Sequence, residues 1–64
     1  MLYDTGDVVR IRSGSGTTYE QTLVFVVRSV DLDTLSVGVR CINPADGIPA
    51  PAVLFFRDIE LMEV

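Results

Sequence analysis

The stretch that decides the fold is QTLVFVVRSV, residues 21–30. Most of its residues are β-branched or aromatic, which favours a β-strand. Strand alternation places Leu23, Phe25 and Val27 on one face, and it places Val24, Val26 and Val30 on the other. A strand that is apolar on both faces is covered on both faces. We therefore expect a central strand with one face in the core and the other under a loop or a second subunit.

Shorter segments with strand character flank this stretch. Residues 8–12 and 35–43 alternate, and two further strands are expected at residues 52–56 and 61–64, with a single helical turn over 57–60 between them. This pattern predicts an all-β fold, a small five-stranded SH3-like barrel with a short helical turn before the last strand and closed edges. The expected core comprises Val9, Ile11, Leu23, Phe25, Val27, Val37, Val39, Phe55 and Leu61, with Cys41 facing it.

The composition limits how such a domain can be stabilised. The 64 residues form one domain spanning 1–64, and a core of this size supplies roughly 3–5 kcal/mol. One cysteine excludes an internal disulfide, and the lack of histidine leaves no zinc site, so we expect neither metal nor cofactor. With 48% hydrophobic residues, the chain has more apolar surface than one small interior hides. Oligomerisation, most simply as a dimer, is the remaining way to stabilise the domain and to cover its apolar surface.

The charged residues favour a protein partner over nucleic acid. Nine acids and five bases give a net charge of −4, whereas nucleic-acid affinity depends on neutralising phosphates. All five bases are arginine, the side chain suited to interfaces and planar acceptors. Strand parity projects four of them outward, and this predicted arginine face is either a docking surface or a solvated, salt-bridged one: Arg10, Arg12, Arg28 and Arg40.

Two further surfaces are candidates for contacts. The glycine-rich residues 13–18 predict a solvated, mobile loop, and Thr17, Thr18 and the adjacent Tyr19 are its candidate contact residues. The outward valines of the central strand, together with Ile42, predict a self-association stripe of Val24, Val26, Val30 and Ile42. The competing hypothesis is that the proline-rich loop at residues 43–52 folds over this stripe within one chain.

Several segments resemble the YodC-like family of small bacterial proteins. Residues 6–14, GDVVRIRSG, are similar to the opening of that family, residues 26–31 resemble its second strand, and VRC at 39–41 resembles its third. Phe55-Phe56, with Leu61 and Val64 after them, resembles the family's ending. The chain departs from the family in having Ile42-Asn43 after the cysteine and in its longer loops. The resemblance implies a small SH3-like barrel and supplies no activity.

These observations favour a non-catalytic protein. Without histidine the chain has no Ser/His or Cys/His pair, so we expect no enzyme. The leading hypothesis is a small accessory or phage-type regulator that docks on another macromolecule as a homo-oligomer. The alternatives are a nucleic-acid-binding barrel that uses the arginine face, and a sponge for a nucleotide-like ligand at a subunit interface. The longest apolar run, residues 23–27, is too short for a membrane span, and a lone cysteine suits the reducing cytoplasm.

Overall fold

A computed structural model describes residues 3–62 as an all-β domain. The strands are β1 (Val8–Ile11), β2 (Val24–Asp31), β3 (Ser36–Cys41), β4 (Val53–Phe55) and β5 (Ile59–Leu61). Two short 3-10 turns, η1 (Glu20–Thr22) and η2 (Phe56–Asp58), are the helical elements within the described residues. The predicted all-β class is confirmed, and η2 is the short turn expected before the last strand. Residues 63 and 64 of the predicted final strand lie outside the described residues.

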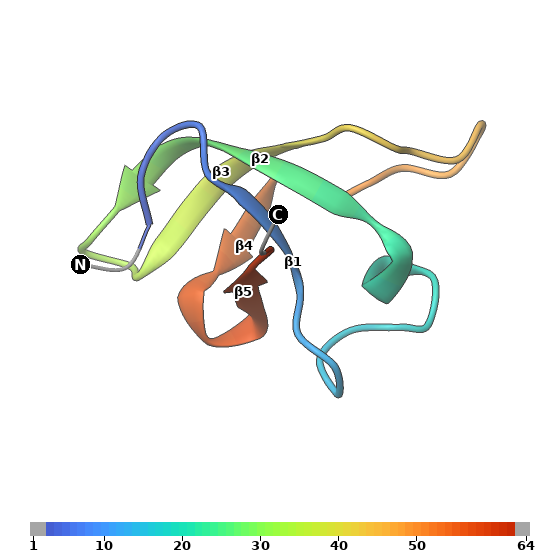
Figure 1. Cartoon of the computed structure of the whole chain (residues 1–64), viewed down its shortest axis with the longest axis horizontal. Coiled ribbons are helices and arrows are strands. Elements are labelled where there is room, and N and C mark those ends of the chain that lie inside the picture. Colours follow the sequence, from blue (N-terminus) through green and yellow to red (C-terminus); the bar gives the residue numbers. More distant parts are fainter. Residues whose placement is uncertain (1–2, 63–64) are drawn as a thin grey trace.

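All five strands belong to one antiparallel sheet with the order β4-β3-β2-β1-β5. Figure 1 shows the long β2 running across the molecule beside β3. The predicted closure of the sheet is wrong, because β4 and β5 lie at its two edges and do not pair. These strands have three residues each, and η2 leads the chain from β4, beside β3, to β5, beside β1. No helix within residues 3–62 is long and apolar enough to cross a membrane.

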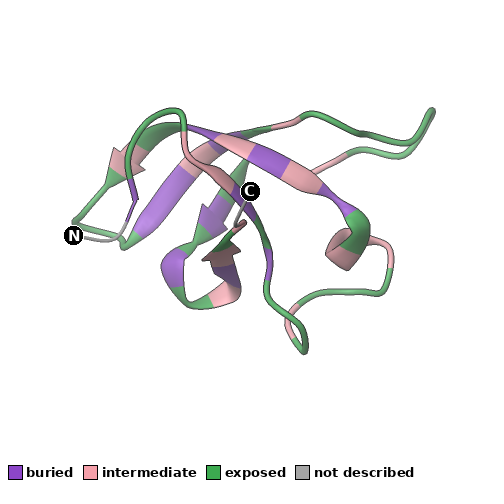
Figure 2. Ribbon diagram, in the orientation of Figure 1, coloured by how far each residue is buried: buried purple, intermediate pink, exposed green. Residues whose placement is uncertain are grey.

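The core lies on one face of this sheet, here named the inner face. Phe25 on β2 is fully buried between Val9 on β1 and Cys41 on β3, its cross-strand partners. Figure 2 shows buried segments recurring along each strand of the sheet. Seven of the nine predicted core residues are buried. Within residues 3–62 the buried apolar residues are Tyr3, Val9, Ile11, Leu23, Phe25, Val27, Val37, Val39, Leu54, Phe56 and Ile59.

The prediction that Phe55 and Leu61 lie in the core is wrong. Their exposed fractions are 45% and 51%. Leu54 pairs with the buried Val37 and takes the inward position of β4, which turns Phe55 outward. The turn η2 then directs Phe56 into the core, where its ring centroid lies 5.2 Å from that of Tyr3. Leu61 pairs with Val9 at the end of an edge strand, where too little structure remains to cover it.

A β-bulge in β2 also changes one predicted face. Val27 pairs with Val39, but the register then shifts so that Ser29 pairs with Gly38 and Val30 with Val37. The extra residue reverses the alternation beyond the bulge. Val30 consequently packs against the core and does not lie on the predicted self-association stripe. Gly38 leaves space for Ser29 here, because a Cβ at position 38 would overlap Ser29 Oγ unless that exposed side chain rotated away.

Candidate functional site

The sheet face opposite the core, here named the outer face, combines valines with arginines. Val26 is flanked across the ladder by Val8 on β1 and Arg40 on β3, and Arg10 on β1 lies opposite Val24. Val24 and Val26 are half-buried, so neighbouring side chains already shield part of their surface. The outer face is therefore a mixed surface in which arginine side chains lie beside Val24 and Val26, and its apolar stripe is narrower than the sequence predicts.

A shallow hollow of about 300 Å³ lies on this face and is lined by Val26, Arg28, Arg40 and Ile42. We name it the arginine hollow. Arg28 and Arg40 are exposed, and neither forms an ion pair with any of residues 3–62. Ile42 is 55% exposed. Two fixed positive charges thus border an apolar surface that water covers in the monomer. The hollow unites residues that the sequence placed in separate arginine and self-association sets.

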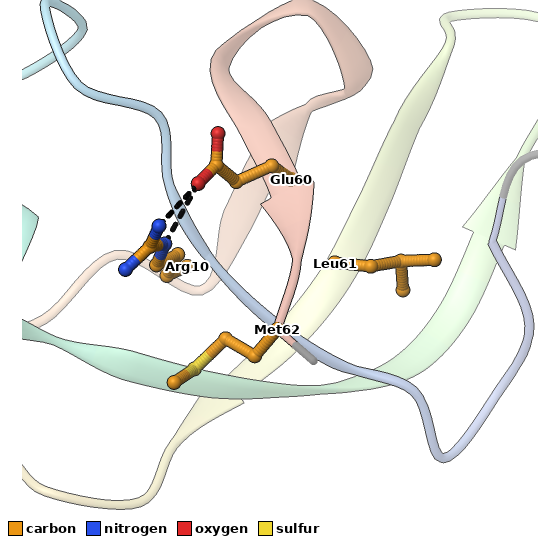
Figure 3. Close-up of a pocket in the computed structure, with 4 residues that line it drawn as sticks. All are labelled: Arg10, Glu60, Leu61 and Met62. Carbon is orange, nitrogen blue, oxygen red and sulfur yellow. Dashed lines mark hydrogen bonds and ion pairs between the residues drawn. The ribbon is translucent and has the colours of Figure 1, made fainter. Parts of the chain in front are cut away.

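The other two predicted face arginines have partners within the chain. Arg10 Nη2 lies 2.7 Å from Glu60 Oε2, and its Nε donates to the same oxygen at 2.8 Å (Figure 3). Both side chains are partly exposed, so the pair contributes less than about 1 kcal/mol. Arg12 donates from Nη2 to the Ile59 carbonyl at 3.2 Å, and its backbone N–H donates to the Asp58 carbonyl. The predicted set of four arginines therefore divides into two paired and two free side chains.

The pair Arg10–Glu60 lies beside a second hollow, of about 350 Å³, with Met62 at its wall. Figure 3 shows Leu61 pointing to the opposite side of β5 from Glu60. This hollow offers a neutralised ion pair and no free charge. It should therefore attract an ionic partner less strongly than the arginine hollow does.

The loop residues predicted as contacts have structural partners. Thr17 and Glu20 bond reciprocally: the Thr17 N–H donates to Glu20 Oε1 at 2.8 Å, and the Glu20 N–H donates to Thr17 Oγ1 at 3.1 Å. These reciprocal bonds have the pattern of a capping box, but they close the turn that leads into η1, whose own N-cap residue, Tyr19, has no side-chain cap. Tyr19 packs against the core and its hydroxyl accepts from the Ala45 N–H at 3.3 Å, whereas Thr18 is exposed. The end of the predicted mobile loop is thus hydrogen-bonded, and Thr18 alone of the three is free of these contacts.

The loop at residues 43–52 does not line the arginine hollow. Ala50 packs against the core cluster, and the backbone of Ala45 bonds to Tyr19. Ile48, the residue expected to cover the valines, is itself 49% exposed. Figure 1 shows the connection between β3 and β4 extending beyond the end of the sheet. Within the described residues, therefore, the predicted lid over the outer face is absent.

Comparison with family models, with curated proteins and with solved structures found no match. The resemblance to YodC-like proteins therefore stays a prediction.

A third hollow, of about 430 Å³, was missed by the sequence reasoning. It is lined by Thr34, Leu35, Phe55, Phe56 and Arg57. The Arg57 guanidinium carbon lies 5.6 Å from the Phe55 ring centroid, and its Nε lies 3.7 Å from Asp58 Oδ2. The sequence does not predict this surface, because the alternation pattern assigns Phe55 to the core. The available signal was the pair of consecutive phenylalanines, because only one of two neighbours on a strand can face the interior.

These surfaces are suited to binding. Arginine, aliphatic and aromatic side chains supply charge, contact area and donors, and none of them is a nucleophile or a general base at neutral pH. Among residues 3–62, no group of three or more His, Cys, Asp or Glu side chains is placed to hold a metal ion.

Proposed function

We propose that this protein is a non-catalytic, cytoplasmic binding module with an SH3-like barrel fold of the kind that the YodC-like resemblance implies. It acts as a small homo-oligomer and docks on another protein through the arginine hollow. The observation that carries the proposal is the pair of guanidinium groups of Arg28 and Arg40, which have no ion-pair partner among residues 3–62 and lie beside the exposed Ile42 and the half-buried Val26. The proposed partner presents an apolar side chain flanked by carboxylates.

The chemistry of arginine supports this choice of partner. A guanidinium group binds a carboxylate through two parallel hydrogen bonds, and it is more weakly hydrated than an ammonium group, so it tolerates an interface. Burying Ile42 supplies the apolar contribution, and the two charges supply orientation and attraction. Nucleic acid is a poorer match because the chain carries a net charge of −4 and Arg10 is neutralised by Glu60.

An array of short peptides tests the proposal. Each peptide places leucine or isoleucine between two flanking residues, which are aspartate or glutamate in one set, asparagine or glutamine in a second, and lysine or arginine in a third. We expect the labelled wild-type protein to bind the acidic set selectively and to lose that binding as salt is raised. Arg40→Ala and Arg28→Ala should each weaken it, whereas Arg57→Ala, which removes an arginine from a different hollow, should not.

Two results would overturn the proposal. Equal binding to the neutral and acidic sets would show that the guanidinium groups do not select the partner. Salt-sensitive retention on DNA that is lost in Arg28→Ala or Arg40→Ala, without selective peptide binding, would assign the hollow to nucleic acid.

A further inference from the structure

The free edge of β4 has unpaired backbone groups. On its other side, β4 pairs with β3: the Val39 N–H donates to the Ala52 carbonyl at 2.8 Å, and the Phe56 N–H donates to the Leu35 carbonyl at 2.9 Å. In an antiparallel ladder, alternate residues direct both backbone groups to the same neighbour. The backbone groups of residues 52, 54 and 56 therefore face β3. Among residues 3–62, the N–H groups of Val53 and Phe55 and the Val53 carbonyl point away from the sheet without a partner, whereas the Phe55 carbonyl accepts the first bond of η2, of which Phe55 is the N-cap.

The side chains at this edge are apolar. Val53 is 57% exposed and Phe55 is 45% exposed, and Leu35, in the same hollow as Phe55, is 54% exposed. No residue of β4 is charged. Proteins that remain monomeric usually protect a sheet edge with charge, proline or a bulge. Here Pro51 protects only the segment that precedes β4, so Val53 and Phe55 remain open to a neighbour.

We propose that the neighbour is a second copy of this chain, whose β4 pairs antiparallel with the first across a two-fold axis at Leu54. In this register Val53 lies opposite Phe55 of the second copy, and Phe55 lies opposite its Val53. In each pair the Phe55 N–H can donate to the Val53 carbonyl of the other copy. The Val53 N–H can donate to the second lone pair of the other copy's Phe55 carbonyl, because η2 uses the first. An aliphatic–aromatic pair across strands is stabilising, and the two-fold axis makes two of them.

The outer face is a poorer place for self-association. A two-fold face-to-face contact would bring Arg28 and Arg40 of both copies together without carboxylate partners among residues 3–62. The β-bulge has also moved Val30 to the core side, which removes one of the predicted stripe residues. Pairing at β4 leaves the arginine hollow free. The inference rests on the homo-oligomer of the proposed function and assigns it an interface separate from the partner site.

Sedimentation of the full chain over a wide concentration range tests this assignment. Three-residue strands make an interface below ~1,200 Å², the size of transient complexes, so we expect a monomer–dimer equilibrium. Phe55→Lys should weaken dimerisation about tenfold or more, since it removes both cross-strand pairs and places two like charges at the axis. Val53→Pro should do the same by removing an outward N–H that β3 does not use.

Matched variants distinguish pairing at the β4 edge from self-association through the outer face. Val53→Thr keeps the N–H that Val53→Pro removes, so it should weaken dimerisation less than Val53→Pro does. Val26→Arg alters only the outer face and should dimerise as wild type does. Circular dichroism confirms folding, and Phe55→Lys keeps the test valid if Val53→Pro does not fold. A monomer at every concentration would overturn both the inference and the homo-oligomer. Dissociation by Val26→Arg but not by Phe55→Lys would overturn the inference alone, because the oligomer would then form through the outer face.

Discussion

Replacing Phe56 with alanine should unfold most molecules at room temperature, whereas the same change at Phe55 should leave a folded domain. The Phe56 side chain is 8% exposed and stacks at a tilt on Tyr3. Truncating it therefore removes buried area and leaves a cavity, at a cost of ~3–5 kcal/mol. That is about the whole stability of a domain this small, roughly 3–5 kcal/mol. Phe55 is 45% exposed, so its truncation leaves no enclosed cavity. The loss of the apolar area that Phe55 does bury should lower the free energy of unfolding by roughly 1–2 kcal/mol.

Urea unfolding followed by far-UV circular dichroism measures both costs on the same scale. All samples should be held at a low concentration, so that dimerisation does not add to the stability of the folded state. Phe25→Ala, at the fully buried centre of β2, serves as the control for a core truncation. A midpoint for Phe55→Ala below that of Phe56→Ala would refute the reasoning, because it would place Phe55 inside and Phe56 outside.

Three further predictions follow from single contacts. Gly38→Ala should lower stability by at most about 1 kcal/mol, since the exposed Ser29 side chain can rotate away from the new Cβ, and that loss should disappear in a Ser29→Ala background, as a double-mutant cycle in urea would show. Thr17→Ala should cost ~0.5–2 kcal/mol, because it removes the hydroxyl that accepts from the Glu20 N–H in the turn before η1; an unchanged urea midpoint would contradict that role. Glu60→Gln should change stability by less than about 1 kcal/mol at low salt and by still less at high salt, since the Arg10–Glu60 pair is partly exposed.

Alternation in the sequence predicted the central part of the fold well. In β1, β2 and β3, the inward residues Val9, Phe25 and Val39 follow a period of two and are buried as expected. These strands each have neighbours on both sides, so burial enforces one register, and a slip of one residue would place the whole apolar set in water. The local pattern and the tertiary contacts therefore agree for these strands.

The edge strands were harder to predict for a physical reason. The segment VLFF at residues 53–56 is apolar throughout, so period-two counting fits either face equally well. Which of these residues face the core depends on where η2 begins, because the turn directs Phe56 inward and leaves Leu54 as the inward residue of β4. A three-residue turn has a weak sequence signal, and its effect on the alternation appears only when β4 pairs with β3.

The bulge in β2 links the interior of the protein to its binding surface. A regular strand would place Val30 on the outer face, where alternation from Val24 and Val26 predicts it. The extra residue between Val27 and Ser29 instead brings Val30 onto the core, and Arg28 remains exposed in the same hollow as Arg40. One local irregularity thus adds apolar contact to a small core and leaves the outer face more basic. On β3, Gly38 lies opposite Ser29 in this bulge and leaves space for the Ser29 side chain.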